Sequence, residues 1–157
     1  MMEKMDVSKG ATFVGYGSRK FDSILLNSKY GIDADHIDLA EIIQDASKKH
    51  YGDYGRRYDI HDLAELNHAK QTAIPHLSYL LGPIARLAEW RRGSARNVLR
   101  KVAAEVEIIA RLFCQVVIHE DLKILDERTE RPVNIPVPNA RDVEIYTKPI
   151  VELQEEE

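Results

Sequence analysis

The chain has 157 residues, a formal charge of −4 at pH 7 and one cysteine, Cys114. This length suits a single domain with a buried core, and 44% apolar with 31% charged residues is typical of a globular chain rather than a disordered one. The net charge excludes a uniformly cationic nucleic-acid binder, and the lone cysteine excludes an intramolecular disulfide framework and a multi-cysteine metal site.

The N-terminal twenty residues lack the apolar stretch of a signal peptide. The most apolar run, residues 108–118, is short and carries Arg111 and Gln115, which favours a buried helix over a membrane span. We therefore expect a cytoplasmic protein without a membrane partner.

Residues 1–34 form a first segment, expected to be short and irregular or β. Residues 11–31 mix β-forming side chains with glycines, and Gly15 and Gly17 indicate a turn or hairpin. Residues 21–26 fit a short helix or a strand equally well.

Residues 35–127 have a helical period and predict a mainly α domain, a bundle of about four helices. Asp35 is the expected N-cap of the first helix, which should end at the glycine-containing loop of residues 51–55. A second helix should start near Asp59 and end or kink at Pro75. The apolar stripes of these two helices are Leu39, Ile42, Ile43 and Ala46, then Leu63, Leu66 and Ala69.

A third apolar stripe, over residues 77–88, keeps its phase through Gly82 and Pro83 and predicts one kinked helix. Gly93 should stop it and Ser94 should cap the last helix, expected from Ala95 to about residue 126. The core stripe expected there is Leu99, Val102, Val106, Ile109, Phe113 and Val116. Further apolar residues widen this surface beyond one stripe, so we expect a second subunit to cover it in a homo-oligomer.

Residues 128–157 are expected to form an extended acidic tail. From residue 120 onward the chain holds 5 basic and 11 acidic residues, a balance of −6. Pro132, Pro136 and Pro138 forbid a helix there, and residues 142–153 could form one strand. The tail could lie on the domain, pair with another subunit or stay mobile.

Two segments share the pattern Asp-Leu-Ala-Glu, at Asp38–Glu41 and at Asp62–Glu65. Residues three apart share a helix face, so each segment displays a carboxylate pair. If the helices pack side by side, the four acids could converge and hold Mg²⁺, which prefers oxygen ligands. Alternatively, the acids simply occupy the solvent side of amphipathic helices.

Basic residues are concentrated just before and within the start of the last helix. Between residues 86 and 101 there are six cations and one acid, Glu89. Arginine forks match phosphate oxygens, and Trp90 offers a face for a base. The cations of this strip are Arg86, Arg91, Arg92, Arg96, Arg100 and Lys101. The alternative is a solvated helix face that pairs with the acidic tail.

Other polar groups have less specific patterns. Lys48, Lys49, Arg56 and Arg57 bracket a tyrosine- and glycine-containing loop that suits nucleotide phosphates or merely a helix end. Glu107, Arg111, Gln115 and His119 recur every four residues, which fits a ladder with a subunit contact, or a metal or water ligand at Glu105 or Glu107. Cys114, among apolar neighbours, is expected to be inert core.

The stretches Leu39–Ile43 and Lys48–Asp53 resemble the "LAE…KKYGD" region of phage-type dATP/dGTP diphosphohydrolases, and Arg86–Gly93 resembles their later "W-Arg-Gly" segment. Residues 102–122 are similar to the last helix of MazG-like pyrophosphohydrolases. The resemblance implies an all-α, usually oligomeric enzyme that holds Mg²⁺ with helix carboxylates. The chain departs from the pattern at Ile108, where an acid should follow Glu105 by three residues.

The leading hypothesis is therefore Mg²⁺-dependent hydrolysis of a nucleoside triphosphate substrate. Asp38, Glu41, Asp62 and Glu65 would hold the metal, with Glu41, Glu65 and Glu105 as catalytic acids. The substrate would be bound by Lys48, Lys49, Asp53, Trp90, Arg91 and Arg92. The rival hypothesis is a non-enzymatic helical oligomer that binds nucleic acid, a nucleotide or a protein through residues 86–101 and the acidic tail.

Overall fold

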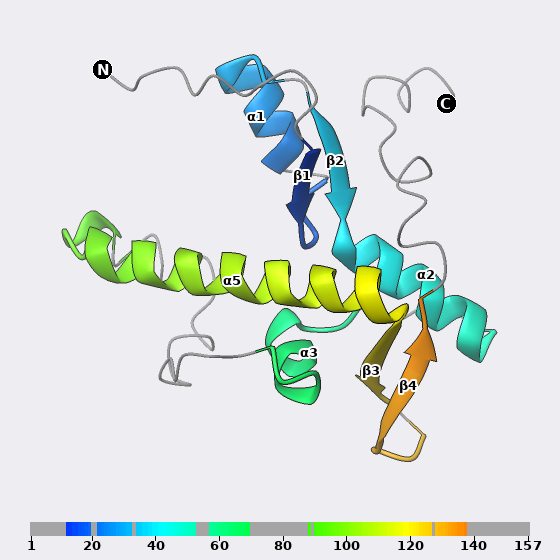
Figure 1. Cartoon of the computed structure of the whole chain (residues 1–157). Coiled ribbons are helices and arrows are strands. Elements are labelled where there is room, and N and C mark those ends of the chain that lie inside the picture. The colour runs from blue at the N-terminus through cyan, green and yellow to red at the C-terminus, as the bar shows by residue number, and fades with distance from the viewer. Residues whose placement is uncertain are drawn as a thin grey trace.

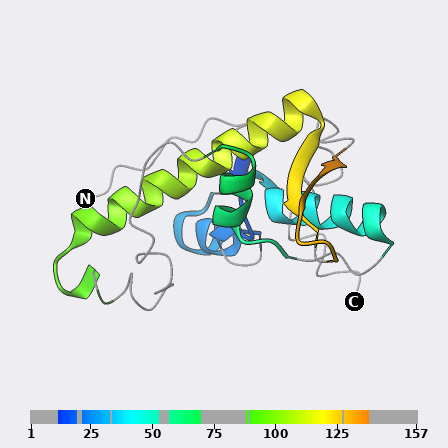
Figure 2. The ribbon, with the colours of Figure 1, turned by 90° about the horizontal axis from the view of Figure 1, so that it is seen from below.

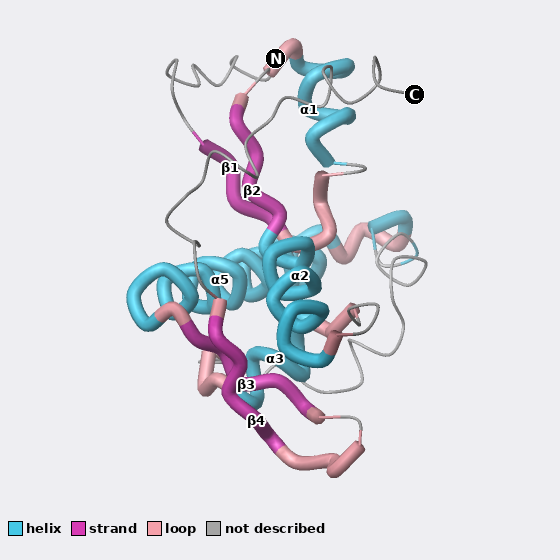
Figure 3. Tube along the Cα trace, turned by 90° about the vertical axis from the view of Figure 1, so that its right-hand side faces the viewer, coloured by secondary structure: helices cyan, strands magenta, loops and turns pink. Residues whose placement is uncertain are grey.

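The computed structural model describes residues 12–19, 22–32, 34–52, 57–69, 88, 90–126 and 128–137. Helix predominates among them, as predicted, but strands complete the core. In chain order the elements are β1 (Thr12–Gly15), α1 (Asp22–Tyr30), β2 (Asp35–Asp38), α2 (Leu39–Tyr51), α3 (Ile60–Leu66), α5 (Ala95–His119), β3 (Asp121–Leu125) and β4 (Pro132–Pro136). The two sheets lie on opposite sides of α2 and α5 (Figures 1 and 3).

The N-terminal segment forms a β-α-β unit. β1 pairs with β2 in parallel, with Thr12 opposite Asp35 and Gly15 opposite Asp38, and α1 makes the crossover. Residues 21–26 fit a helix or a strand in the sequence, and in the structure the chain is helical from Asp22 onward. Because β2 belongs to this pair, the boundary expected between residues 34 and 35 falls inside the unit.

Helix α2 follows β2 without a loop. The expected N-cap at Asp35 was wrong, because residues 35–38 form the strand and Asp38 caps the helix. The predicted stripe is confirmed, since Leu39, Ile42, Ile43 and Ala46 are all buried. Gly52 ends the helix in the left-handed conformation with φ of 69°.

Helix α3 begins where the sequence predicts. The Asp59 side chain accepts a hydrogen bond from the backbone N–H of His61 at 2.8 Å, and Leu63 and Ala64 are buried. The helix ends at Leu66, well before Pro75. The third stripe, residues 77–87, and the loop residues 53–56 lie outside the described part of the chain.

Helix α5 starts at Ala95 after Gly93 and Ser94, as predicted, but ends earlier than expected. Glu120 adopts φ of 56°, and the chain turns directly into β3 instead of continuing to residue 126. The expected core stripe was wrong over the first half of the helix, where Leu99 is 61% and Val106 58% exposed. The buried residues all belong to the second half: Ile108, Leu112 and Val116.

Strands β3 and β4 form an antiparallel hairpin, with Leu122 opposite Ile135. The prolines at 132 and 136 do impose an extended path, as predicted, but this path is paired and joins the core through Ile135 and Val137. The boundary expected between residues 127 and 128 therefore falls inside this hairpin. The possible strand at 142–153 lies outside the described residues.

The turn of this hairpin is organised by Asp126. Its carboxylate accepts hydrogen bonds from the Arg128 N–H at 3.0 Å and the Thr129 hydroxyl at 2.8 Å, and these bonds lower its pKa. Within the described residues, no helix combines the length and apolarity needed to cross a bilayer.

Candidate functional site

The Asp38 carboxylate joins three parts of the chain. Its Oδ1 accepts hydrogen bonds from the backbone N–H of Gly17 at 2.8 Å and of Ala40 at 3.0 Å, and its Oδ2 accepts one from Arg19 N–H at 3.0 Å. The residue is 2% exposed. Both lone pairs of Oδ1 therefore accept hydrogen bonds, and Asp38 connects the loop after β1 to the start of α2.

Other contacts hold the same loop. The guanidinium of Arg19 pairs with Glu41 at 3.0 Å, and the Ser18 hydroxyl lies 2.7 Å from Nε2 of His36. A Cβ atom added to Gly15 would overlap the Ser18 side chain, which explains a glycine at the end of β1. Asp38 and Glu41 thus both have protein partners, and we call this contact between the loop after β1 and the start of α2 the packed joint.

The four acids expected to hold Mg²⁺ lie in two different surroundings in the structure. Asp38 and Glu41 belong to this packed joint, while Asp62 and Glu65 are exposed on α3. Across the described ranges, no three His, Cys, Asp or Glu side chains lie close enough to hold a metal ion. No contact in the described residues brings the twin Asp-Leu-Ala-Glu segments together, and Mg²⁺ binding by these acids stays a prediction. Glu105, half-buried on α5, joins no such group.

The residues expected to bind substrate are also separated. Lys48 and Lys49 are exposed near the C-terminal end of α2, whereas Trp90, Arg91 and Arg92 precede α5. The C-terminal end of α2 and the N-terminal end of α5 lie at opposite sides of the molecule in both Figure 1 and Figure 2. The two groups therefore do not share one site. Asp53 lies outside the described residues.

Residues 90–101 form a basic segment, which we name the basic face and which comprises Trp90, Arg91, Arg92, Arg96, Arg100 and Lys101. It contains five cations and no acid, its four arginines are exposed, and Trp90 is 55% exposed. This first half of α5 extends away from β1, β2 and α3 (Figures 1 and 2). The first turn of α5 has no acidic residue, and Ser94 makes no side-chain capping hydrogen bond. The positive end of the helix dipole therefore adds to the charge of the face.

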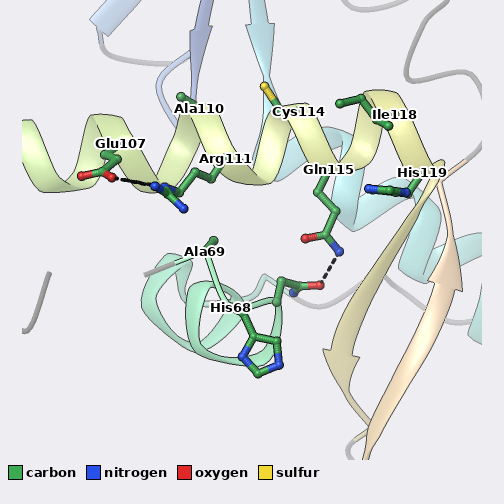
Figure 4. A pocket seen from close by; sticks show the side chains of 10 residues that line it. His68, Ala69, Glu107, Ala110, Arg111, Cys114, Gln115, Ile118 and His119 are labelled. Atoms are coloured by element: carbon green, nitrogen blue, oxygen red, sulfur yellow. Dashed lines mark hydrogen bonds and ion pairs between the residues drawn. The ribbon is translucent and has the colours of Figure 1, made fainter. Parts of the chain in front are cut away.

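A pocket of about 550 Å³ lies between the end of α3 and the second half of α5, and we call it the α3–α5 pocket. Figure 4 shows Arg111 and Gln115 pointing from α5 toward the α3 side. The α3–α5 pocket is lined by Asn67, His68, Ala69, Glu107, Ala110, Arg111, Cys114, Gln115, Ile118 and His119. The polar stripe predicted on the last helix thus lines a pocket. Cys114, expected to be core, is exposed.

Asn67 is a structural residue that the sequence pattern did not single out. Its Oδ1 accepts hydrogen bonds from Gln115 Nε2 and from Lys123 N–H, both at 2.9 Å. Its Nδ2 donates to the carbonyls of Leu63 at 2.9 Å and Lys123 at 2.8 Å. The carboxamide therefore pairs with the edge of β3 as a neighbouring strand would. An asparagine directly after a helix was the available signal.

Tyr16 joins the same core from the N-terminal loop. Its hydroxyl donates to the backbone carbonyl of Tyr58, whose own hydroxyl lies 2.9 Å from Ser47 Oγ. Burial raises the pKa of the Tyr16 phenol, and the charges of Asp59 and Asp38 raise it further. The phenol is therefore a neutral hydrogen-bond donor that links the loop after β1 to the segment before α3.

We expect stability to fall when the pH drops below about 6.5 because of His36. Burial lowers the pKa of His36 from its ordinary value of 6.5, although Asp38 acts in the opposite direction. The unfolded chain therefore binds the proton more readily, so this contribution is complete above the unfolded pKa and is lost as the pH falls through the folded one. Urea unfolding at pH 7.5 and 5.5 should show the loss, and His36→Gln should reduce it. An equal loss in the variant would contradict the assignment to His36.

Comparisons with protein-family models, curated proteins and solved structures gave no match for this chain. The resemblance to nucleotide pyrophosphohydrolases stays a prediction from the sequence.

Proposed function

We propose that this protein binds single-stranded nucleic acid through the basic face at the start of α5. The observation that carries the proposal is the combination of five cations, no acid and an exposed Trp90 within residues 90–101. Arginines bind backbone phosphates, and an exposed indole stacks on an unpaired base. Cations combined with a stacking ring are typical of proteins that bind single strands without strong sequence preference.

Hydrolysis of nucleoside triphosphates with Mg²⁺ is the weaker candidate. It needs several carboxylates around one cation, and the described geometry of Asp38 and Glu41 does not favour that arrangement. Binding to the basic face requires no metal and no convergence of acids. We therefore favour the binding function over the enzymatic one.

The test is fluorescence anisotropy of the full chain with a labelled 20-nucleotide DNA strand at several salt concentrations. We expect log affinity to fall with log salt with a slope of about −3, which corresponds to about four phosphate contacts. The double variant Arg96→Glu/Arg100→Glu should weaken binding about 30-fold or more, and Trp90→Ala about tenfold. EDTA should change neither affinity nor slope.

The matched control is Lys48→Glu/Lys49→Glu, which makes the same change in net charge at the far end of α2. Its effect should stay below about threefold, because the two lysines lie at the opposite side of the molecule from the basic face (Figures 1 and 2) and salt screens charges over a Debye length of about 8 Å. Equal losses of affinity in the two double variants would mean that the net charge of the protein, and not the basic face, governs binding. An affinity that does not depend on salt would contradict phosphate binding outright.

A further inference from the structure

We propose that the α3–α5 pocket binds a small phosphate monoester that carries hydroxyl groups, such as a sugar phosphate. Its volume of about 550 Å³ lies in the range of small-molecule sites. The pocket is lined by one guanidinium, the carboxylate of Glu107, two imidazoles, two carboxamides and the Cys114 thiol. Ala69, Ala110 and Ile118 add apolar surface. This site is separate from the basic face and does not rest on nucleic-acid binding.

Arg111 supplies the phosphate contact. Its Nε and Nη2 both approach one carboxylate oxygen of Glu107, at 3.2 and 3.1 Å. This pair uses one edge of the guanidinium, and Nη1 makes no hydrogen bond to a described residue. The side chain is 35% exposed and points toward the α3 side in Figure 4. Glu107 thus orients a guanidinium whose remaining donors match the oxygens of a phosphate.

Gln115 supplies the contact to a hydroxyl group. Its Nε2 donates to Asn67, whose four hydrogen bonds hold that carboxamide in place. The Oε1 of Gln115 accepts no hydrogen bond from the described residues, and Figure 4 shows it facing the pocket. A preorganised acceptor of this kind suits a ligand that carries a hydroxyl donor.

The spacing along α5 sets the size of the ligand. Arg111 and Gln115 are one turn apart, about 6 Å along the helix axis, a distance that a short polyol phosphate spans. Ala69 and Ala110 also line the pocket and add apolar surface to it. His119 and His68 also line the pocket, although Figure 4 shows the His68 ring directed away from α5. His68 is held at φ of 53°, an uncommon conformation for a residue with a side chain.

Isothermal titration of the full chain with ribose 5-phosphate tests the proposal, with inorganic phosphate and ribose as separate arms. We expect the phosphorylated sugar to bind at least about tenfold more tightly than phosphate, and ribose to give no measurable heat. Arg111→Gln should weaken binding at least about tenfold, whereas Arg96→Gln, on the basic face, should leave it unchanged. Equal binding of phosphate and ribose 5-phosphate would overturn the hydroxyl contact.

A second variant distinguishes loss of the ligand contact from loss of folding in Arg111→Gln. Ala110 is exposed on α5, so Ala110→Glu should fold normally while it places a negative charge in the pocket. We expect this variant to abolish sugar-phosphate binding and to keep the affinity for single-stranded DNA within about twofold. Undiminished sugar-phosphate binding by Ala110→Glu, or no heat from the wild-type chain at millimolar ligand, would overturn the site. The Arg96→Glu/Arg100→Glu variant separates the two proposals, because it should lose DNA binding and retain sugar-phosphate binding.

Discussion

Replacement of Asp38 by alanine is expected to lower the free energy of unfolding by about 3 kcal/mol, the larger of the two effects on stability. The change removes the acceptor of three backbone N–H groups, those of Gly17, Arg19 and Ala40, at a position that is 2% exposed. Two of these groups belong to the loop after β1, so both the cap of α2 and the attachment of the loop are lost. Urea unfolding monitored by circular dichroism measures the change.

Asp38→Asn separates charge from shape. The amide can keep one oxygen for two of the N–H groups, but its NH₂ then faces the third, a donor that needs an acceptor. We expect about 2 kcal/mol of destabilisation for this variant. Asp35→Asn, at the exposed start of the same strand, is the control and should change stability by less than about 0.5 kcal/mol. Comparable effects in the two positions would contradict the role of Asp38 as a buried cap.

Replacement of Asn67 by alanine is expected to cost about 2–3 kcal/mol, because four hydrogen bonds disappear together. The N–H and carbonyl of Lys123 would lose the side chain that pairs with both of them at the edge of β3. Since α3, α5 and β3 meet at this side chain, the loss should also loosen the end of α3. Hydrogen exchange of the Lys123 amide reports the local effect, and urea unfolding reports the global one.

Two variants sharpen the test of Asn67. Asn67→Asp keeps the acceptor for the Lys123 N–H but turns an oxygen toward the carbonyls of Leu63 and Lys123, so we expect it to be nearly as destabilising as alanine. Asn134→Ala, at an exposed position of β4, should cost less than about 0.5 kcal/mol. If the Lys123 amide exchanged at the wild-type rate in Asn67→Ala, the side chain would not protect the edge of β3.

Several local features could be predicted from the sequence because they depend on a few neighbouring residues. The apolar spacing of α2, the cap at Asp59 and the stop at Gly93 all lie within one or two turns of the positions they determine. The extended path through Pro132 and Pro136 has the same local origin, since proline cannot continue a helix.

The end of α5 was harder to predict. The apolar period runs on past residue 119 without glycine or proline, so nothing in the composition marks a stop. The chain turns at Glu120, a residue with a side chain in the left-handed conformation, and pairing with β4 stabilises the extended backbone of β3 directly after this turn. The alternation of Leu122, Lys123 and Ile124 was the available period-two signal for a strand.

By itself, the sequence determined the helical class of the chain, several helix ends and the clustering of cations near Trp90, because propensity, capping and charge density are properties of contiguous residues. Only the tertiary structure decided what the acids do. Spacing cannot distinguish a carboxylate that binds a cation from one that caps a helix, since both need the same oxygens. The loop after β1 lies about twenty residues from Asp38 along the chain, and its backbone N–H groups occupy that carboxylate in the folded protein.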